Sequence, residues 1–340
     1  MNTTTLRNAG MVLLLASAAV AAQTPKWANA RVETRAGGAL ERDFKALVGA
    51  QTAPAWIAYS VPMVAGRHQM CGGHVHLEAT PRGVYDSGTS FLEGPTNLFV
   101  FFRVENRAVE KIRTLSEECQ IDAGGLAVYW LTGVRPEESI ALLASYLDTA
   151  TDRKSDAPLS AIAMHASPAA DAALDRFTAS TQPEQRRMQA IFWLGVARGR
   201  HGYEVVKRLA ESDPSDKVRE RAIFALTQST EAQAIEAIIG VAKNDRSIRV
   251  RSQALFWLGQ KAGQKAVSAI REAIDNDPET EVKKKAVFAL SQLPKDEGVP
   301  LLIQVARTHR NPEVKKQAFF WLGQSKDPRA LGFFTEVLAK

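Results

Sequence analysis

The stretch RHQMCGGHVH holds three of the six histidines of the chain and one of its two cysteines. His68, Cys71, His74 and His76 follow the spacing His-x-x-Cys-x-x-His-x-His, and imidazole and thiolate groups are common protein ligands of zinc and copper. In an extended strand His74 and His76 point to the same side, which suits two ligands of one ion. The spacing therefore predicts either a metal site or a disulfide at Cys71 with histidines beside it.

The compartment bears on this choice, and the first residues, MNTTTLRNAGMVLLLASAAVAAQ, predict a signal peptide over residues 1–22. One basic residue, Arg7, precedes an apolar run that ends in small residues and is too short to span a bilayer comfortably. No later stretch is long and apolar enough for a membrane helix, so we expect no membrane span. We therefore expect a periplasmic or secreted protein.

Export favours a disulfide, because disulfides persist in oxidising compartments. Cys71 and Cys119 are the two cysteines of the chain, and a bridge between them would close a loop of about 49 residues and stabilise the fold by roughly 3–4 kcal/mol. A metal site built on His68, His74 and His76 remains an alternative, although a tetrahedral site needs three or four ligands. Two unpaired thiols are the third possibility.

Bulk composition is that of a folded globular protein. The chain has 340 residues, 45% of them hydrophobic, and 43 basic against 37 acidic residues give a net charge of +6. This charge is too modest to indicate nucleic-acid binding, and an exported protein has little access to nucleic acid. We therefore expect no nucleic-acid partner.

The second half of the chain is a repeat with a period of 32 residues. Five segments align without a gap on their phenylalanines: Phe192 in QAIFWLG, Phe224 in RAIFALTQ, Phe256 in QALFWLGQ, Phe288 in KAVFALSQ and Phe320 in QAFFWLGQ. Each unit is predicted to form two helices, such as SIRVRSQALFWLGQ and QKAVSAIREAIDND, whose apolar residues have helical spacing. A lone helical hairpin cannot bury its apolar side, so the units are expected to stack into a superhelix.

These units resemble HEAT repeats, in the short form also seen in phycobilisome-lyase-type proteins. The matching motif is the start of the first helix, DKVRERAIFAL, IRVRSQALFWL, TEVKKKAVFAL and PEVKKQAFFWL, and the resemblance covers residues 157–340 in about six units. It implies a mainly α fold, an α-α superhelix that binds another protein or peptide. In the lyase relatives such repeats assist bilin attachment, so a bilin-lyase-like accessory role is a remote alternative, which export disfavours.

The resemblance also implies a ladder of acid–base pairs between neighbouring units. The acid stands six residues before the base, giving Asp213 with Arg219, Asp245 with Arg251 and Asp277 with Lys283. The outer copies depart from this pattern, because Thr181 precedes Arg187 and His309 precedes Lys315. The ladder is therefore expected in the middle of the repeat only.

Two further repeat positions carry a pattern. The residue after each phenylalanine alternates between large and small, as Trp193, Ala225, Trp257, Ala289 and Trp321. We expect each indole to fill the gap beside a neighbouring alanine, with an aromatic ladder on a binding face as the alternative. The second position holds Gln228, Gln260, Gln292 and Gln324, whose amides either bond helix ends and each other or present hydrogen-bonding groups to an extended peptide.

The N-terminal part differs in texture. Residues 23–134 contain short β-branched or aromatic segments bounded by turn residues, which predicts a small antiparallel β-rich domain with a helix near residues 40–48. The segment LFVFFRVENRAVEKIRTLS predicts a hairpin that turns at residues 105–107. Residues 135–156 are expected to form a capping helix and linker between this domain and the repeats.

No nucleotide-binding loop, nucleophile elbow or His-Glu-x-x-His motif is present. The sequence therefore favours a non-enzymatic exported scaffold that needs no cofactor, with a metal-binding or metal-sensing protein as the alternative. In the expected superhelix the second helix of each unit lines the inner face. The partner-binding candidates are polar residues of those helices: Glu204, Lys207, Glu236, Arg271 and Gln304.

Overall fold

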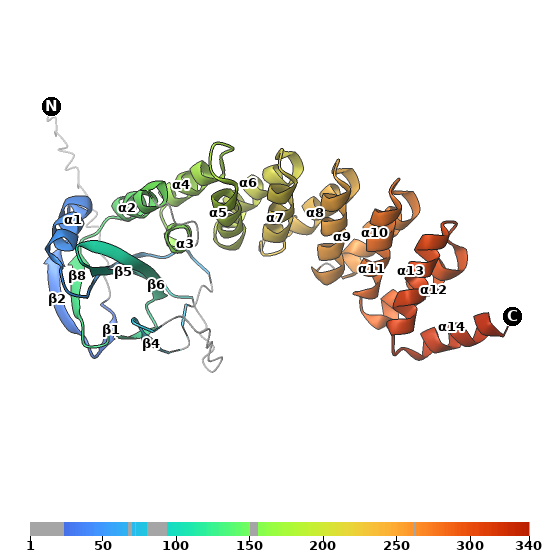
Figure 1. Cartoon of the computed structure of the whole chain (residues 1–340), viewed down its shortest axis with the longest axis horizontal. Helices are drawn as coiled ribbons and strands as arrows, with labels where there is room; N and C mark the ends of the chain where they lie inside the picture. The colour runs from blue at the N-terminus through green and yellow to red at the C-terminus, as the bar shows by residue number, and fades with distance from the viewer. Residues whose placement is uncertain are drawn as a thin grey trace, which may run out of the picture.

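The computed structural model describes residues 24–66, 70–71, 73–79, 94–149, 156–261 and 263–339. The predicted signal peptide and His68 lie outside these residues. A β-rich part forms one end of the molecule, and a curved stack of helices extends from it to α14 at the other end (Figure 1). The prediction of a mainly α superhelix preceded by a small β-rich part is confirmed.

The β-rich part contains a five-stranded sheet in the order β2-β8-β3-β5-β6 and a three-stranded sheet in the order β1-β7-β4. The larger sheet consists of β2 (Arg31–Ala36), β8 (Ala127–Thr132), β3 (Ala55–Pro62), β5 (Asn97–Glu105) and β6 (Ala108–Ser116). The smaller sheet consists of β1 (Lys26–Ala28), β7 (Gln120–Asp122) and β4 (His74–His76). The sheets position both the disulfide and the two histidines of the opening motif.

The prediction of an antiparallel domain is wrong for half of this architecture. Strand β8 runs parallel to both β2 and β3, and the pairs within the smaller sheet are parallel as well. The helix α1 (Leu40–Ala50) forms the crossover from β2 to β3, and β8 arrives later in the chain and inserts between them. Parallel neighbours need a crossover instead of a tight turn, so no local sequence signal marks the pairing.

The hairpin predicted around residues 105–107 is confirmed. Strands β5 and β6 pair antiparallel, with Glu105 opposite Ala108. The two residues between them, Asn106 and Arg107, have φ values of 50° and 63°. Left-handed backbone at both positions matches the twist of the flanking strands, which is the geometry that a two-residue hairpin turn favours.

The large sheet is buried on both faces. On one face Phe44 of α1 packs against Phe102 with ring centroids 4.7 Å apart. On the other face Trp56, Phe101 and Trp130 pack under the smaller sheet, in one cluster with the disulfide cysteines. Burial on both faces explains why β3 and β5 read as continuous apolar runs instead of alternating patterns.

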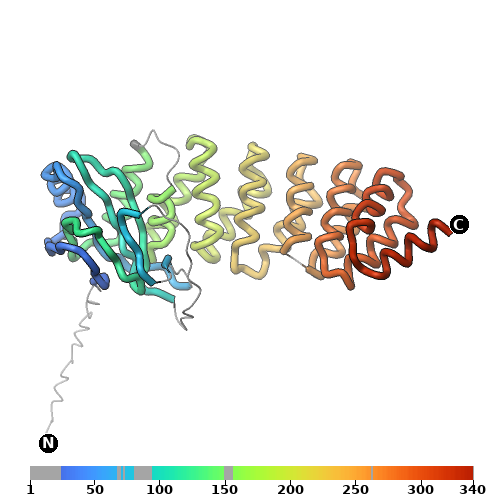
Figure 2. Tube along the Cα trace, turned by 60° about the horizontal axis from the view of Figure 1, so that its bottom comes forward, coloured from blue at the N-terminus to red at the C-terminus, as the bar shows by residue number. Residues whose placement is uncertain are grey.

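The helical part is a stack of hairpins (Figure 2). Three helices lead into it: α2 (Pro136–Thr149), α3 (Ala157–Met164) and α4 (Ala169–Thr178). The first helices of the five regular units, here called A helices, are α5 (Glu184–Ala197), α7 (Asp216–Leu226), α9 (Ile248–Lys261), α11 (Thr280–Ser291) and α13 (Pro312–Gln324). The second helices, here called B helices, are α6 (Gly199–Ser212), α8 (Ala234–Asn244), α10 (Gln264–Asn276), α12 (Lys295–Thr308) and α14 (Pro328–Leu338).

A buried polar network joins the β-rich part to the first helices. The hydroxyls of Tyr59 on β3 and Ser139 on α2 lie 2.8 Å apart, and Nε2 of His165 lies 2.8 Å from the same Ser139 hydroxyl. His165 also bonds the carbonyl of Ala161, and Arg198 donates to the His165 carbonyl oxygen. Burial lowers the pKa of His165 to about 4, so the imidazole is neutral in the folded protein.

Neighbouring A helices meet in two alternating ways. Gly195 lies so close to the next A helix that a Cβ atom there would be 2.6 Å from the carbonyl oxygen of Ala225, and Gly259 faces Ala289 with a corresponding distance of 2.8 Å. The other interfaces are spaced by an indole instead, such as that of Trp257, whose ring centroid lies 5.0 Å from that of Phe224. The large–small alternation therefore corresponds to two kinds of interface.

Candidate functional site

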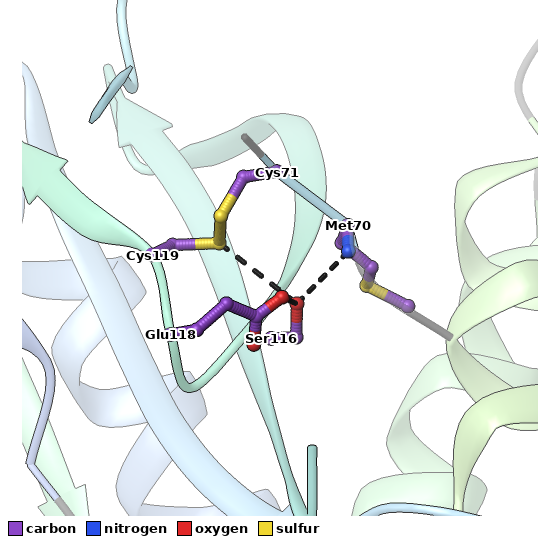
Figure 3. The surroundings of a disulfide bond; sticks show 5 residues. All are labelled: Met70, Cys71, Ser116, Glu118 and Cys119. Carbon is purple, nitrogen blue, oxygen red and sulfur yellow. Dashed lines mark hydrogen bonds between the residues drawn. A yellow bond between two sulfur atoms is a disulfide. The ribbon is translucent and has the colours of Figure 1, made fainter. Parts of the chain in front are cut away.

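The opening motif forms a disulfide, as predicted. Cys71 and Cys119 are bonded, with their Cα atoms 5.9 Å apart (Figure 3). Both cysteines are buried, and the hydroxyl of Ser116 beside them accepts the backbone N–H of Met70 at 2.9 Å and donates to Glu118. The bridge ties the segment before β4 to the turn between β6 and β7.

The histidines of the motif lie in β4. His74 and His76 are exposed, with their rings stacked at 6.1 Å, and Nδ1 of His76 lies 3.0 Å from Oδ2 of Asp122. The backbone N–H of Gly124 and then the charge of His76 hold the pKa of Asp122 below its usual value. These three side chains do not form a ligand cluster.

Within the described residues, one group of three His, Cys, Asp or Glu side chains brings its ligand atoms within 4.8 Å of one another. It consists of Cys71, Glu118 and Cys119, and its two sulfur atoms are already bonded to each other. The described residues therefore give the metal hypothesis no support, and its third histidine, His68, lies outside them.

The acid–base ladder joins each A helix to the turn of the next unit. Arg219 donates from Nε to Asp245 Oδ2 at 2.7 Å and from Nη1 to the carbonyl oxygen of Asp213 at 2.8 Å. Arg251 repeats this geometry with Asp277 at 2.8 Å and the Asp245 carbonyl at 2.9 Å. Each arginine thus bonds the backbone of the acid six residues earlier and the carboxylate 26 residues later.

The ladder is displaced by one unit from its predicted position. Arg187, which the sequence placed outside it, pairs with Asp213 in a buried bridge. At the other end Lys283 does not pair with Asp277; its ammonium group donates to the carbonyl oxygen of Asp275 at 2.7 Å. The six-residue spacing identifies most members, but the carboxylate that each base reaches belongs to the next unit, so the ladder begins and ends one unit earlier.

A groove lies between α10 and α12, where the ladder has ended. One cavity of about 420 Å³ is lined by Arg271, Ile274, Asp275, Lys283, Leu290, Leu301, Gln304, Val305, Thr308, His309, Arg310 and Asn311. A second cavity of about 710 Å³ is lined by Gln264, Val267, Ser268, Arg271, Asp275, Glu297, Pro300 and Leu301. The two share Arg271, Asp275 and Leu301, so they are continuous parts of one groove.

The structure brings together two of the five B-helix candidates. Arg271 of α10 and Gln304 of α12 line the 420 Å³ cavity. Glu204 and Lys207 lie on α6, where Glu204 pairs with Arg200, and Glu236 lies exposed on α8. The β-rich part sits at the far end of the stack and does not cover the groove (Figures 1 and 2).

The glutamine row is partly bonded to itself. Gln260 donates to Gln292 across one unit boundary at 2.9 Å, whereas Gln228 donates to the neighbouring Thr227 hydroxyl at 2.8 Å. Gln324 lines a separate cavity of about 320 Å³ together with Gln292 and Trp321. The row therefore satisfies some of its hydrogen bonds within the stack and lies apart from the groove.

Sequence reasoning missed several residues of these sites. Lys283 and His309 stand out only when the 26-residue offset of the ladder is known, because that offset pairs them as the next base and acid. Arg310 and Asp275 carried no signal beyond their exposed positions at helix ends. Ser139 and His165 of the buried network lie far apart in the chain, and nothing in their local sequence indicates the contact.

Comparison with known proteins agrees with the helical architecture. A family model described as HEAT repeats matches residues 203–291 and 267–340. A search of curated proteins gives no match. Within the described residues, no helix is both long and apolar enough to cross a membrane.

Three solved structures illustrate the structural similarity. The complex of CpcE and CpcF of phycocyanin lyase from Nostoc sp. PCC7120 is 20% identical, with 56% of this chain and 76% of that chain covered and a TM-score of 0.32. YIBA of Escherichia coli is 22% identical, with coverages of 49% and 64% and a TM-score of 0.35. Human deoxyhypusine hydroxylase is 16% identical, with coverages of 60% and 80% and a TM-score of 0.30. We draw no functional conclusion from these similarities.

Proposed function

Since the chain carries HEAT repeats, we propose that it is a non-enzymatic scaffold that binds another protein or peptide in the groove between α10 and α12. The observation that carries this proposal is the groove itself: two continuous cavities of about 420 and 710 Å³ on B helices that the β-rich part leaves uncovered. Polar groups from different helices converge there, including Arg271 and Gln304, which is the arrangement that fixes a bound segment.

We also propose that the protein works outside the cytoplasm, exported by a signal peptide over residues 1–22. The disulfide between Cys71 and Cys119 supports this proposal, because such bridges persist in oxidising compartments. Neither the sequence motifs nor the described side chains suggest a catalytic role, and the proposed scaffold needs no cofactor.

Affinity capture with the full chain tests the proposed function. Wild-type protein, an Arg271→Ala/Gln304→Ala variant and an Arg208→Ala control are incubated with an extract of the native source. Arg208 is exposed on α6, and its loss changes the net charge by the same amount as the groove variant. We expect a partner, identified by mass spectrometry, that wild type and control retain and the groove variant loses. Equal recovery by all three proteins would refute the groove as the binding site.

A further inference from the structure

The 420 Å³ cavity coincides with the position of the next rung of the ladder. In the regular rungs an arginine of one A helix meets an aspartate at the start of the next unit, 26 residues later, as Arg251 meets Asp277. The same offset from Lys283 leads to His309, and both residues line this cavity. The fourth rung therefore has a base but lacks a carboxylate.

His309 replaces the structural role of the aspartate but not its charge. In the complete rungs one carboxylate oxygen caps the turn, as when Asp213 accepts the backbone N–H of Ser215 at 2.9 Å. His309 does the same through Nδ1, which accepts the N–H of Asn311 at 3.0 Å, while Nε2 lies 3.1 Å from the Ile274 carbonyl oxygen. Both ring nitrogens are thus used, and Lys283 faces no negative charge from this position.

The cavity has an excess of positive charge. Three of its lining residues are basic, Arg271, Lys283 and Arg310, against the single carboxylate of Asp275. The guanidinium groups of Arg271 and Arg310 make no hydrogen bond or ion pair of standard geometry with any residue in the described part of the chain. Lys283 uses one of its three N–H donors on the Asp275 carbonyl.

Apolar side chains close the remaining wall, namely Ile274, Leu290, Leu301 and Val305. Such a wall excludes water from part of the site and strengthens the attraction between an anion and the nearby cations. A charge-assisted hydrogen bond to a carboxylate is about twice as strong as a neutral one. The cavity therefore combines the donors of a ladder rung with space for an external acceptor.

We propose that this cavity binds a carboxylate group of an acidic peptide or protein, which takes the place of the aspartate that the fourth rung lacks. This inference deepens the proposed scaffold function and rests on it for the source of the carboxylate. The 710 Å³ cavity shares Arg271 and Leu301 with this one and gives the rest of the bound segment a path along α10 and α12.

Isothermal titration calorimetry on the full chain tests the proposal with three probes. These are an N-acetylated, C-amidated tetraglutamate peptide, the matching tetraglutamine peptide, and succinate. We expect the tetraglutamate peptide to bind, the tetraglutamine peptide to show no binding, and Lys283→Gln to weaken the tetraglutamate affinity about tenfold through loss of a charged hydrogen bond.

His309→Asp is the sharpest variant, because it supplies the missing carboxylate from within. We expect it to abolish peptide binding while the protein stays folded. Lys326→Gln is the control, since Lys326 is exposed, lines neither cavity of the groove and lowers the net charge by the same one unit. We expect the control to bind like wild type. Lys283→Gln provides the same test if His309→Asp does not fold.

Each other outcome has a definite meaning. Equal binding of the two peptides, or unchanged binding by His309→Asp, would overturn the proposal. Succinate binding as tight as that of the peptide would overturn the peptide as the source and leave carboxylate recognition standing. If the peptide fails to bind while the capture experiment still yields a groove-dependent partner, the carboxylate inference fails and the scaffold function survives.

Discussion

Replacing Gly195 or Gly259 by alanine should destabilise the helical stack, whereas the same replacement at Gly323 should not. All three glycines follow Trp-Leu in an A helix, so the local sequence is matched. A Cβ at Gly195 would lie 2.6 Å from the carbonyl oxygen of Ala225, and one at Gly259 would lie 2.8 Å from that of Ala289. These atoms belong to the backbone of the next A helix and cannot rotate away.

The expected magnitude follows from two opposing terms. Overpacking of a close interface costs about 1–3 kcal/mol, and replacing glycine by alanine in a helix gains up to about 1 kcal/mol. We therefore expect Gly195→Ala and Gly259→Ala to lower the free energy of unfolding by about 1–2 kcal/mol. At Gly323 the nearest atom, Cζ of Phe334, lies 4.0 Å away, so only the gain of up to about 1 kcal/mol remains.

Urea unfolding followed by far-ultraviolet circular dichroism measures these changes. Stacked repeats can unfold in more than one step, so the comparison uses the first transition of each variant against wild type. The test depends on the sign, which should differ between Gly323→Ala and the other two variants. If all three variants shift the transition in the same direction, the close approach of alternate A helices is refuted.

Three further predictions concern buried groups. Arg219→Met should lower the free energy of unfolding by about 3 kcal/mol in urea titration, because it leaves the buried Asp245 carboxylate without its main partner. Reduction of the bridge between Cys71 and Cys119 should cost about 3–4 kcal/mol, measured as a lower urea midpoint for the near-ultraviolet signal in reductant, and an unchanged midpoint would contradict it. The folded-state pKa of His165 is lowered from 6.5 to about 4, so its contribution to stability is present above pH 6.5 and falls by about 3 kcal/mol as the pH drops to 4. Thermal unfolding should show this loss in wild type and less of it in His165→Gln.

The repeats were predictable because every unit repeats the same physical problem. Five phenylalanines at a fixed spacing, each within a fully apolar block, admit a stacked pair of helices and little else, and the structure has these helices. The hairpin of β5 and β6 was equally local, since Asn106 and Arg107 adopt the left-handed backbone that the turn needs. Local pattern and short sequence separation made both features visible.

The candidate site was less predictable, because it depends on contacts between units. Arg271 and Gln304 were chosen as polar B-helix positions, and the structure places them in one cavity. The significance of Lys283 and His309 depends on the distance between turns of adjacent units, which the sequence alone does not give. The parallel insertion of β8 escaped prediction for the same reason, since its partners lie far away in the chain.

The alternation of interfaces sets the step by which such a stack can lengthen or shorten. Deleting one 32-residue unit would bring Gly195 opposite Trp257 instead of Ala225, so a face shaped for a methyl group would receive an indole. Deleting or duplicating two consecutive units restores every glycine to its alanine and every indole to its phenylalanine. The heritable module of this chain is therefore the 64-residue pair, and we expect variants of different length to change by that amount.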